Sequence, residues 1–114
     1  MRHTLEALAD DTRREIVSLL AGGERTAGDL AARFAISRPA VSRHLRVLRE
    51  AGLVSVREEA QRRIYALDAA PLAELDHWLS SYRVFWSQRL DALDTELRRG
   101  ARQGKASTLQ EKGA

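Results

Sequence analysis

The residues of this 114-residue sequence best suited to bind a ligand are arginines gathered in its middle third. Residues 33–66 contain eight arginines against three glutamates, Glu50, Glu58 and Glu59, whereas the net charge of the whole chain is only +3. The flanking segments, 1–32 and 67–97, are both acidic. Arginine forms bidentate hydrogen bonds with phosphate and with guanine. A basic block between acidic segments therefore indicates one surface that binds a polyanion.

Residues for catalysis or metal binding are scarce. The chain has no cysteine, which excludes disulfides and thiolate ligands. His77 and Asp91 would share a face of one helix about 21 Å apart, and two ligands make a poor zinc site. Ser80 and Ser81 lie near His77 but lack oxyanion donors and a third partner. We therefore predict that the protein is not an enzyme and that it has no metal and no cofactor.

The arginine block lies within a series of four short predicted helices. The first spans about residues 3–9. The second begins at the cap candidates Asp10, Asp11 and Thr12, with Glu15 as a capping-box partner, and ends at a glycine pair. Thr26 caps the third.

The fourth predicted helix carries most of the basic block. Ser37 caps it, Pro39 lies in its first turn and Gly52 ends it. Its apolar residues, Val41, Leu45 and Leu48, recur at helical spacing and so should face the core.

Beyond Gly52 the spacing of the apolar residues changes from the 3.6-residue period of a helix to the 2-residue period of a strand. This alternation predicts two strands of a hairpin, residues 53–57 and 63–67, separated by the polar tip 58–62. Two short helices joined by a tight turn and followed by a hairpin form a winged helix-turn-helix, whose second helix lies in the major groove of DNA. The fold class is therefore mainly α with a small β-hairpin.

The candidate DNA contacts are the residues of the fourth helix that face away from its buried stripe, together with the wing. His44 has either a structural or a phosphate-contacting role, and Arg57 and Arg63 are either solvated or in contact with DNA. The full candidate set is Ser37, Arg38, Pro39, Ser42, Arg43, His44, Arg46, Arg57, Gln61, Arg62 and Arg63.

Two stretches resemble the ArsR/SmtB-type regulators. The segment 8–16 is similar to the family's opening signature, with Asp11 in place of the usual proline. The segment 36–54 resembles the family's recognition-helix motif, with Arg38 where glutamine is common. The resemblance covers roughly residues 4–97. It implies a homodimeric winged-helix repressor of imperfect inverted repeats, with DNA contacts at Arg38, Pro39, Ser42 and Arg43.

The resemblance also bears on metal sensing. Many family members bind metal through cysteines early in the third helix, and the matching positions here are Thr26 and Gly28. The segment 82–90 looks like the aromatic last helix of metal-independent members. The resemblance therefore implies a metal-independent member, and it identifies no small-molecule effector.

A long helix, residues 71–98, is predicted after the hairpin, and it carries an apolar stripe that a domain of this size cannot cover alone. We predict that it forms a homodimer with help from the first helix. Purely internal packing of the stripe is the alternative. The candidate interface residues are Leu5, Leu8, Leu75, Trp78, Leu79, Tyr82, Phe85, Trp86, Leu90 and Leu93.

The expected organisation is one DNA-binding and dimerisation domain, residues 1–98, and a basic tail, 99–114, that we predict to be disordered. The chain has no apolar run long enough for a membrane span and no signal-peptide pattern at its start, so we expect a cytoplasmic protein. The main prediction is a regulator that binds double-stranded operator DNA. The alternative is a winged helix used only for protein contacts, which would not need its arginines on one side.

Overall fold

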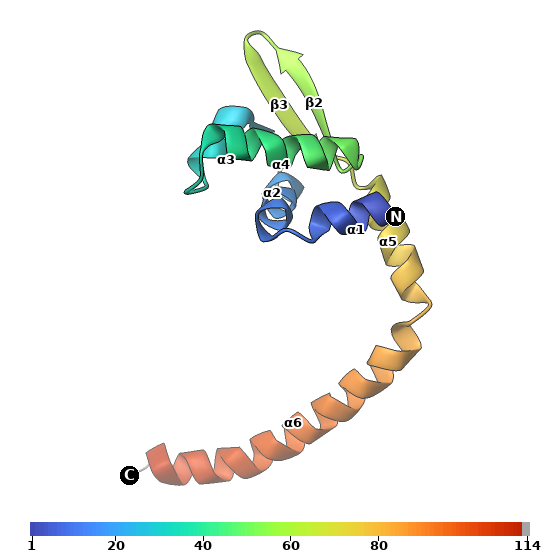
Figure 1. Ribbon diagram of the computed structural model, residues 1–114. Coiled ribbons are helices and arrows are strands. Elements are labelled where there is room, and N and C mark those ends of the chain that lie inside the picture. Colours follow the sequence, from blue (N-terminus) through green and yellow to red (C-terminus); the bar gives the residue numbers. More distant parts are fainter. Residues whose placement is uncertain (113–114) are drawn as a thin grey trace. The chain divides into compact units, whose positions relative to one another are not determined.

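Helices account for most of the structure, and three short strands form one small antiparallel sheet (Figure 1). The computed structural model describes the backbone of residues 1–112 and the side chains of residues 1–100. The chain divides into two units, Met1–His77 and Trp78–Ala114. The elements are α1 (Arg2–Leu8), α2 (Asp11–Ala21), β1 (Arg25–Thr26), α3 (Ala27–Ala32), α4 (Arg38–Glu50), β2 (Val54–Glu59), β3 (Arg62–Leu67), α5 (Ala70–Ser80) and α6 (Arg83–Lys112).

The first unit has the predicted winged helix-turn-helix architecture. Helices α3 and α4 form the helix pair, and the β2–β3 hairpin extends beyond α4 as the wing (Figure 1). Strand β1, which the sequence pattern does not reveal, pairs with β3 and gives the sheet the order β1–β3–β2. A two-residue strand has too few side chains to show alternation, so only its partner identifies it.

The core of the first unit confirms the predicted inward stripe of α4. Val41, Leu45 and Leu48 are at most 2% exposed. They pack with side chains from the two preceding helices and from the hairpin, namely Ile16, Leu20, Leu30, Leu53, Val54 and Tyr65. Complete burial of this stripe fixes the opposite face of α4 toward solvent.

Local hydrogen bonds set the ends of the helices. The Ser37 hydroxyl accepts from the Ala40 amide at 3.2 Å, which confirms the predicted cap of α4. At α2 the cap is Asp10, whose carboxylate accepts from the Arg13 amide, and the predicted capping box with Glu15 does not form. A capping box needs the acidic residue three positions after the cap, and in α2 that position is Arg13. The capping box forms instead at α3, between Thr26 and Asp29.

The long helix predicted over residues 71–98 is interrupted. Helix α5 ends at Ser80 and α6 begins at Arg83. At the break the amide and the hydroxyl of Ser81 both donate to the Trp78 carbonyl, at 3.3 and 2.6 Å. Serine competes for backbone hydrogen bonds in this way and so favours helix ends over helix interiors.

Helix α6 continues through the segment that we expected to be disordered. The structure has helix as far as Lys112, whereas the sequence predicted a disordered tail from residue 99. Residues 113–114 lie outside the described residues. Alanine, leucine, arginine, lysine and glutamine, which make up much of this segment, are strong helix formers, and this propensity prevails over its glycines. Within residues 1–112, none of the helices combines the length and the apolar character that crossing a lipid bilayer requires.

Candidate nucleic-acid interface

The outer face of α4 carries most of the candidate contacts. Arg38, Pro39, Ser42, Arg43 and Arg46 are all exposed, and Ser37 is exposed at the start of the helix. Residues 38–43 lie in the first two turns of α4, where the side chains of a groove-bound helix reach base edges. The structure therefore brings these six predicted residues together on one face.

The wing places its arginines on both faces of the hairpin. In the β2–β3 register Arg57 lies opposite Ile64, Glu58 opposite Arg63 and Glu59 opposite Arg62. Directly opposed residues share a face and successive residues alternate. Arg63 therefore shares a face with Tyr65, and Arg62 lies on the other face together with Arg57. The tight turn between the strands contains Gln61 and Ala60, whose φ of 57° is in the left-handed region.

Arg57 is already paired within the protein. Its guanidinium contacts Glu24 at 2.7 Å and Glu59 at 3.2 Å. The hydrogen bond with Glu24 raises the pKa of Arg57, and the same bond lowers the pKa of Glu24. Because two carboxylates neutralise this arginine, the structure favours an internal role for Arg57 over contact with phosphate.

The other candidate arginines have no such partner. Within residues 1–100, no carboxylate lies within ion-pair distance of Arg38, Arg43, Arg46, Arg62 or Arg63. Five guanidinium groups on α4 and the wing thus remain available to phosphate or base edges.

His44 lies on the inner side of α4, against the junction between α1 and α2. Its Nδ1 is 3.3 Å from Nη1 of Arg13 and 3.8 Å from Oδ2 of Asp10. Arg13 also donates from Nε to the Ala7 carbonyl at 2.7 Å and from Nη2 to the Glu6 carbonyl at 3.3 Å, so it closes the end of α1. An arginine can only donate, so Nδ1 of His44 is the acceptor in this contact.

This contact favours the structural role for His44 of the two that the sequence left open. A half-buried ring between α4 and the α1–α2 junction positions the recognition helix. Sequence reasoning missed Arg13 and Asp10 as its partners, because they are about thirty residues away and nothing in the local pattern links them.

Asp10 gives this cluster a pH dependence. The hydrogen bond from the Arg13 amide lowers the pKa of Asp10, with smaller contributions from the charges of His44 and Arg13. A lowered carboxyl pKa stabilises the fold above the unfolded-state pKa, and that stability is lost as the pH falls through the folded-state pKa.

We expect Asp10→Ala to lower the free energy of unfolding by about 1 kcal/mol at pH 7, because the α2 cap is lost. The difference from the parent protein should shrink as the pH falls through the lowered pKa, because the protonated carboxyl is a weaker acceptor. Urea unfolding at several pH values measures it. Asp10→Asn is the matched control. Its amide oxygen still accepts the cap hydrogen bond, but it does not titrate, so its free energy of unfolding should lack the pH dependence that the Asp10 carboxyl causes. A pH-independent loss in Asp10→Ala would contradict the assignment.

Candidate metal ligands do not cluster. Within the part of the chain that the structure describes, no group of three or more His, Cys, Asp or Glu side chains could hold one ion. His3 pairs with Glu6 at 3.8 Å at the exposed start of α1.

The fold and this surface define a winged helix-turn-helix DNA-binding transcription regulator. Residues 10–56 match the model of the bacterial regulatory proteins of the arsR family. The chain belongs to that family, whose members are transcription regulators and not enzymes. The alternative of a winged helix that makes only protein contacts is not favoured by these similarities.

Relatives and solved structures agree with this assignment. The chain is 38% identical to the transcriptional repressor SdpR of Bacillus subtilis over 72% of its own length and 91% of that protein. It is 48% identical to the HTH-type transcriptional regulator Rv2034 of Mycobacterium tuberculosis, over 75% and 77% of the two chains. An ArsR-like transcriptional regulator from Rhodococcus sp. RHA1 has a similar structure, with a TM-score of 0.65, 31% identity, and coverage of 82% and 89%.

Proposed function

We propose that the chain is a homodimeric repressor that binds an imperfect inverted repeat, with α4 in the major groove and the wing on the adjacent backbone. The observation that carries the proposal is the exposed set of unpaired arginines on α4 and β3, above a fully buried inner stripe. Arg38, Ser42 and Arg43 read base edges, and Arg62 and Arg63 bind phosphates. The name of one relative, a transcriptional repressor, supports repression. The place of action is the cytoplasm, where bacterial DNA lies.

The second unit supports dimerisation. Trp86, Leu90, Leu93 and Leu97 recur at intervals of four, three and four residues along α6, and each is between 37% and 61% exposed. A row of this kind, flanked by Phe85, is an apolar patch that a soluble protein covers with a partner. The aromatic rings of Trp78, Tyr82 and Phe85 contact one another in series at the start of the row.

The two candidate interface residues of α1 differ in exposure. Leu5 is 43% exposed and remains available to a partner, whereas Leu8 packs against the core of its own unit. Leu75 and Leu79 are half-buried. The proposed interface is therefore centred on α6, and Leu5 remains a candidate contact from the first unit. Two copies would bring two α4 helices to two half-sites of an inverted repeat.

The proposal is tested by a gel shift on the DNA upstream of the protein's own gene, with a scrambled duplex as competitor. We expect a discrete complex that the scrambled duplex does not compete away, and footprinting should show two protected half-sites about one helical turn apart. A protein that retards both duplexes equally at all salt concentrations would contradict sequence-specific binding.

We expect no metal dependence of DNA binding. The residues at the thiol positions of metal-binding family members are Thr26, whose hydroxyl is a poor metal ligand, and Gly28, which has no side chain. Operator affinity should be unchanged by added zinc or by a chelator, as measured by fluorescence anisotropy. A tenfold change, about 1.4 kcal/mol, with a defined metal stoichiometry would contradict this expectation.

A further inference from the structure

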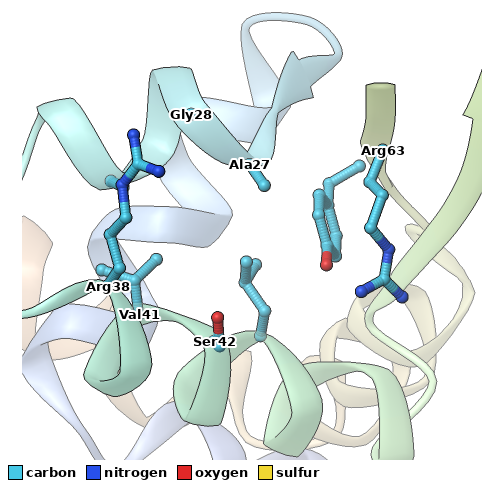
Figure 2. A pocket seen from close by; sticks show the side chains of 9 residues that line it. Ala27, Gly28, Arg38, Val41, Ser42 and Arg63 are labelled. Carbon is cyan, nitrogen blue, oxygen red and sulfur yellow. The ribbon is translucent and has the colours of Figure 1, made fainter. Parts of the chain in front are cut away.

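A hollow of about 260 Å³ lies between the helix-turn-helix and the wing, within the first unit (Figure 2). Helix α3, helix α4 and strand β3 each form one side. In Figure 2 the side chains of Arg38 and Arg63 stand on opposite sides of the hollow, and the Ser42 hydroxyl points into it from α4. The lining residues are Ala27, Gly28, Ala31, Arg38, Val41, Ser42, Leu45, Arg63 and Tyr65.

The hollow exists because α3 presents only small side chains to it. Three of its lining residues are Ala27, Gly28 and Ala31. A Cβ atom added at Gly28 would meet nothing closer than the Thr26 hydroxyl oxygen, at 3.9 Å. The space is thus open, and it is near the lower limit of the clefts that bind small molecules.

The chemistry of the lining combines an apolar base with two cations. Ala27 and Ala31 supply most of this base, since Val41 and Leu45 line the hollow but are each only 2% exposed. Arg38 and Arg63 have no carboxylate partner within residues 1–100, unlike Arg57 on the same hairpin. Ser42 and Tyr65 add two hydroxyl groups. A bare phosphate would use the arginines but not the apolar base, whereas a carboxylate with a hydrocarbon body would use both.

We infer that this hollow binds a small organic carboxylate with an apolar body, and that such a ligand competes with DNA. The carboxylate pairs with Arg63 at the rim, and the hydrocarbon body packs on the small side chains of α3 that line the hollow. Competition follows because Arg38, Ser42 and Arg63 are also proposed DNA contacts. The competition rests on the proposed function, whereas ligand binding itself does not.

Binding is tested on the full chain without DNA, by following amide chemical shifts during titration with benzoate and with hexanoate. We expect saturable shifts centred on residues that line the hollow. Benzamide, which lacks the charge, and acetate, which lacks the apolar body, should each bind about tenfold more weakly. Benzamide binding as tightly as benzoate would overturn the charge requirement, and absence of saturable shifts with both carboxylates would overturn the site.

Three variants locate the site. Arg63→Ala should weaken benzoate binding about tenfold, whereas Arg62→Ala, on the opposite face of the hairpin, should leave it unchanged. Ala27→Leu should fill the hollow and abolish binding, with thermal melting to show that it folds. Because Arg63→Ala removes side-chain atoms from the rim alone, it tests the site even where Ala27→Leu does not fold. Equal losses in Arg62→Ala and Arg63→Ala would overturn the site.

Competition is then measured by anisotropy with labelled operator DNA. Benzoate at ten times its own dissociation constant should weaken operator binding about tenfold per subunit, or about a hundredfold for the parent dimer, and it should have no such effect in Arg63→Ala. Operator affinity unchanged at saturating benzoate would overturn the competition. A protein that binds benzoate but no DNA would contradict the proposed function and leave the ligand site standing.

Discussion

Trp86→Glu is expected to convert the protein from a dimer into a monomer at micromolar concentration. Each copy of the substitution places an unpaired carboxylate in the centre of the proposed interface, which costs at least about 2 kcal/mol. A symmetric dimer contains it twice, so dimerisation should weaken by at least about 4 kcal/mol, roughly a thousandfold. Light scattering or sedimentation gives the particle mass.

The same substitution should impair DNA binding without touching the DNA-contacting surface. A monomer reaches only one half-site, so it forfeits the gain from linking two binding modules, about 10²- to 10⁴-fold. The core of the first unit does not include Trp86, so its cooperative unfolding should persist.

Gln88→Glu is the matched control for Trp86→Glu. It adds the same carboxylate two residues further along α6, about 200° around the helix from Trp86. We expect it to remain a dimer and to bind the operator nearly as well as the parent protein. An unchanged particle mass in Trp86→Glu would refute the interface on α6.

Arg43→Ala should lower the affinity for the operator far more than the affinity for a scrambled duplex. Arg43 is exposed on the second turn of α4 and has no internal carboxylate partner within residues 1–100. Loss of a bidentate hydrogen-bonded pair with guanine costs about 1–3 kcal/mol per half-site. Over two half-sites this is at least about 2 kcal/mol, or roughly a 30-fold loss of specific binding.

Arg62→Ala is expected to behave differently, because a phosphate contact carries no sequence information. It should weaken binding to both duplexes alike. The logarithm of the binding constant falls linearly with the logarithm of the salt concentration, and the slope of this line is the salt slope. Its magnitude should decrease by about 0.9 for each phosphate that a subunit no longer neutralises. Titration of both duplexes at three or more salt concentrations separates the two variants. If Arg43→Ala preserves the ratio of specific to non-specific binding while Arg62→Ala abolishes it, the reading and positioning roles are reversed.

Arg57→Ala gives a useful contrast within the same hairpin. Its guanidinium is held by Glu24 and Glu59, so we do not expect its removal to change the salt slope as the removal of Arg62 does. The sequence placed both residues in the same class of candidate contacts. Their difference arises from the fold. Glu24 precedes β1, and β1 and β2 both pair with β3, which brings Glu24 within reach of Arg57.

The sequence alone determined the features that depend on neighbouring residues. The inward stripe of α4, its Ser37 cap, the proline in its first turn and the hairpin after Gly52 follow from periodicity and capping, and the structure has all of them. The outer face of α4 followed directly, since a helix with one buried stripe has only one free face. The motif over residues 36–54 was enough to indicate the family.

Only the tertiary structure decided which of these side chains already have partners within the protein. It pairs Arg57 with Glu24, holds His44 against Arg13 and Asp10, and puts Arg62 and Arg63 on opposite faces of the wing. It also opens the hollow beside α3 and ends α5 at Ser80. Charge pairing and cavity shape depend on distances between segments far apart in the chain, and the local pattern of apolar and polar residues contains no information about those distances.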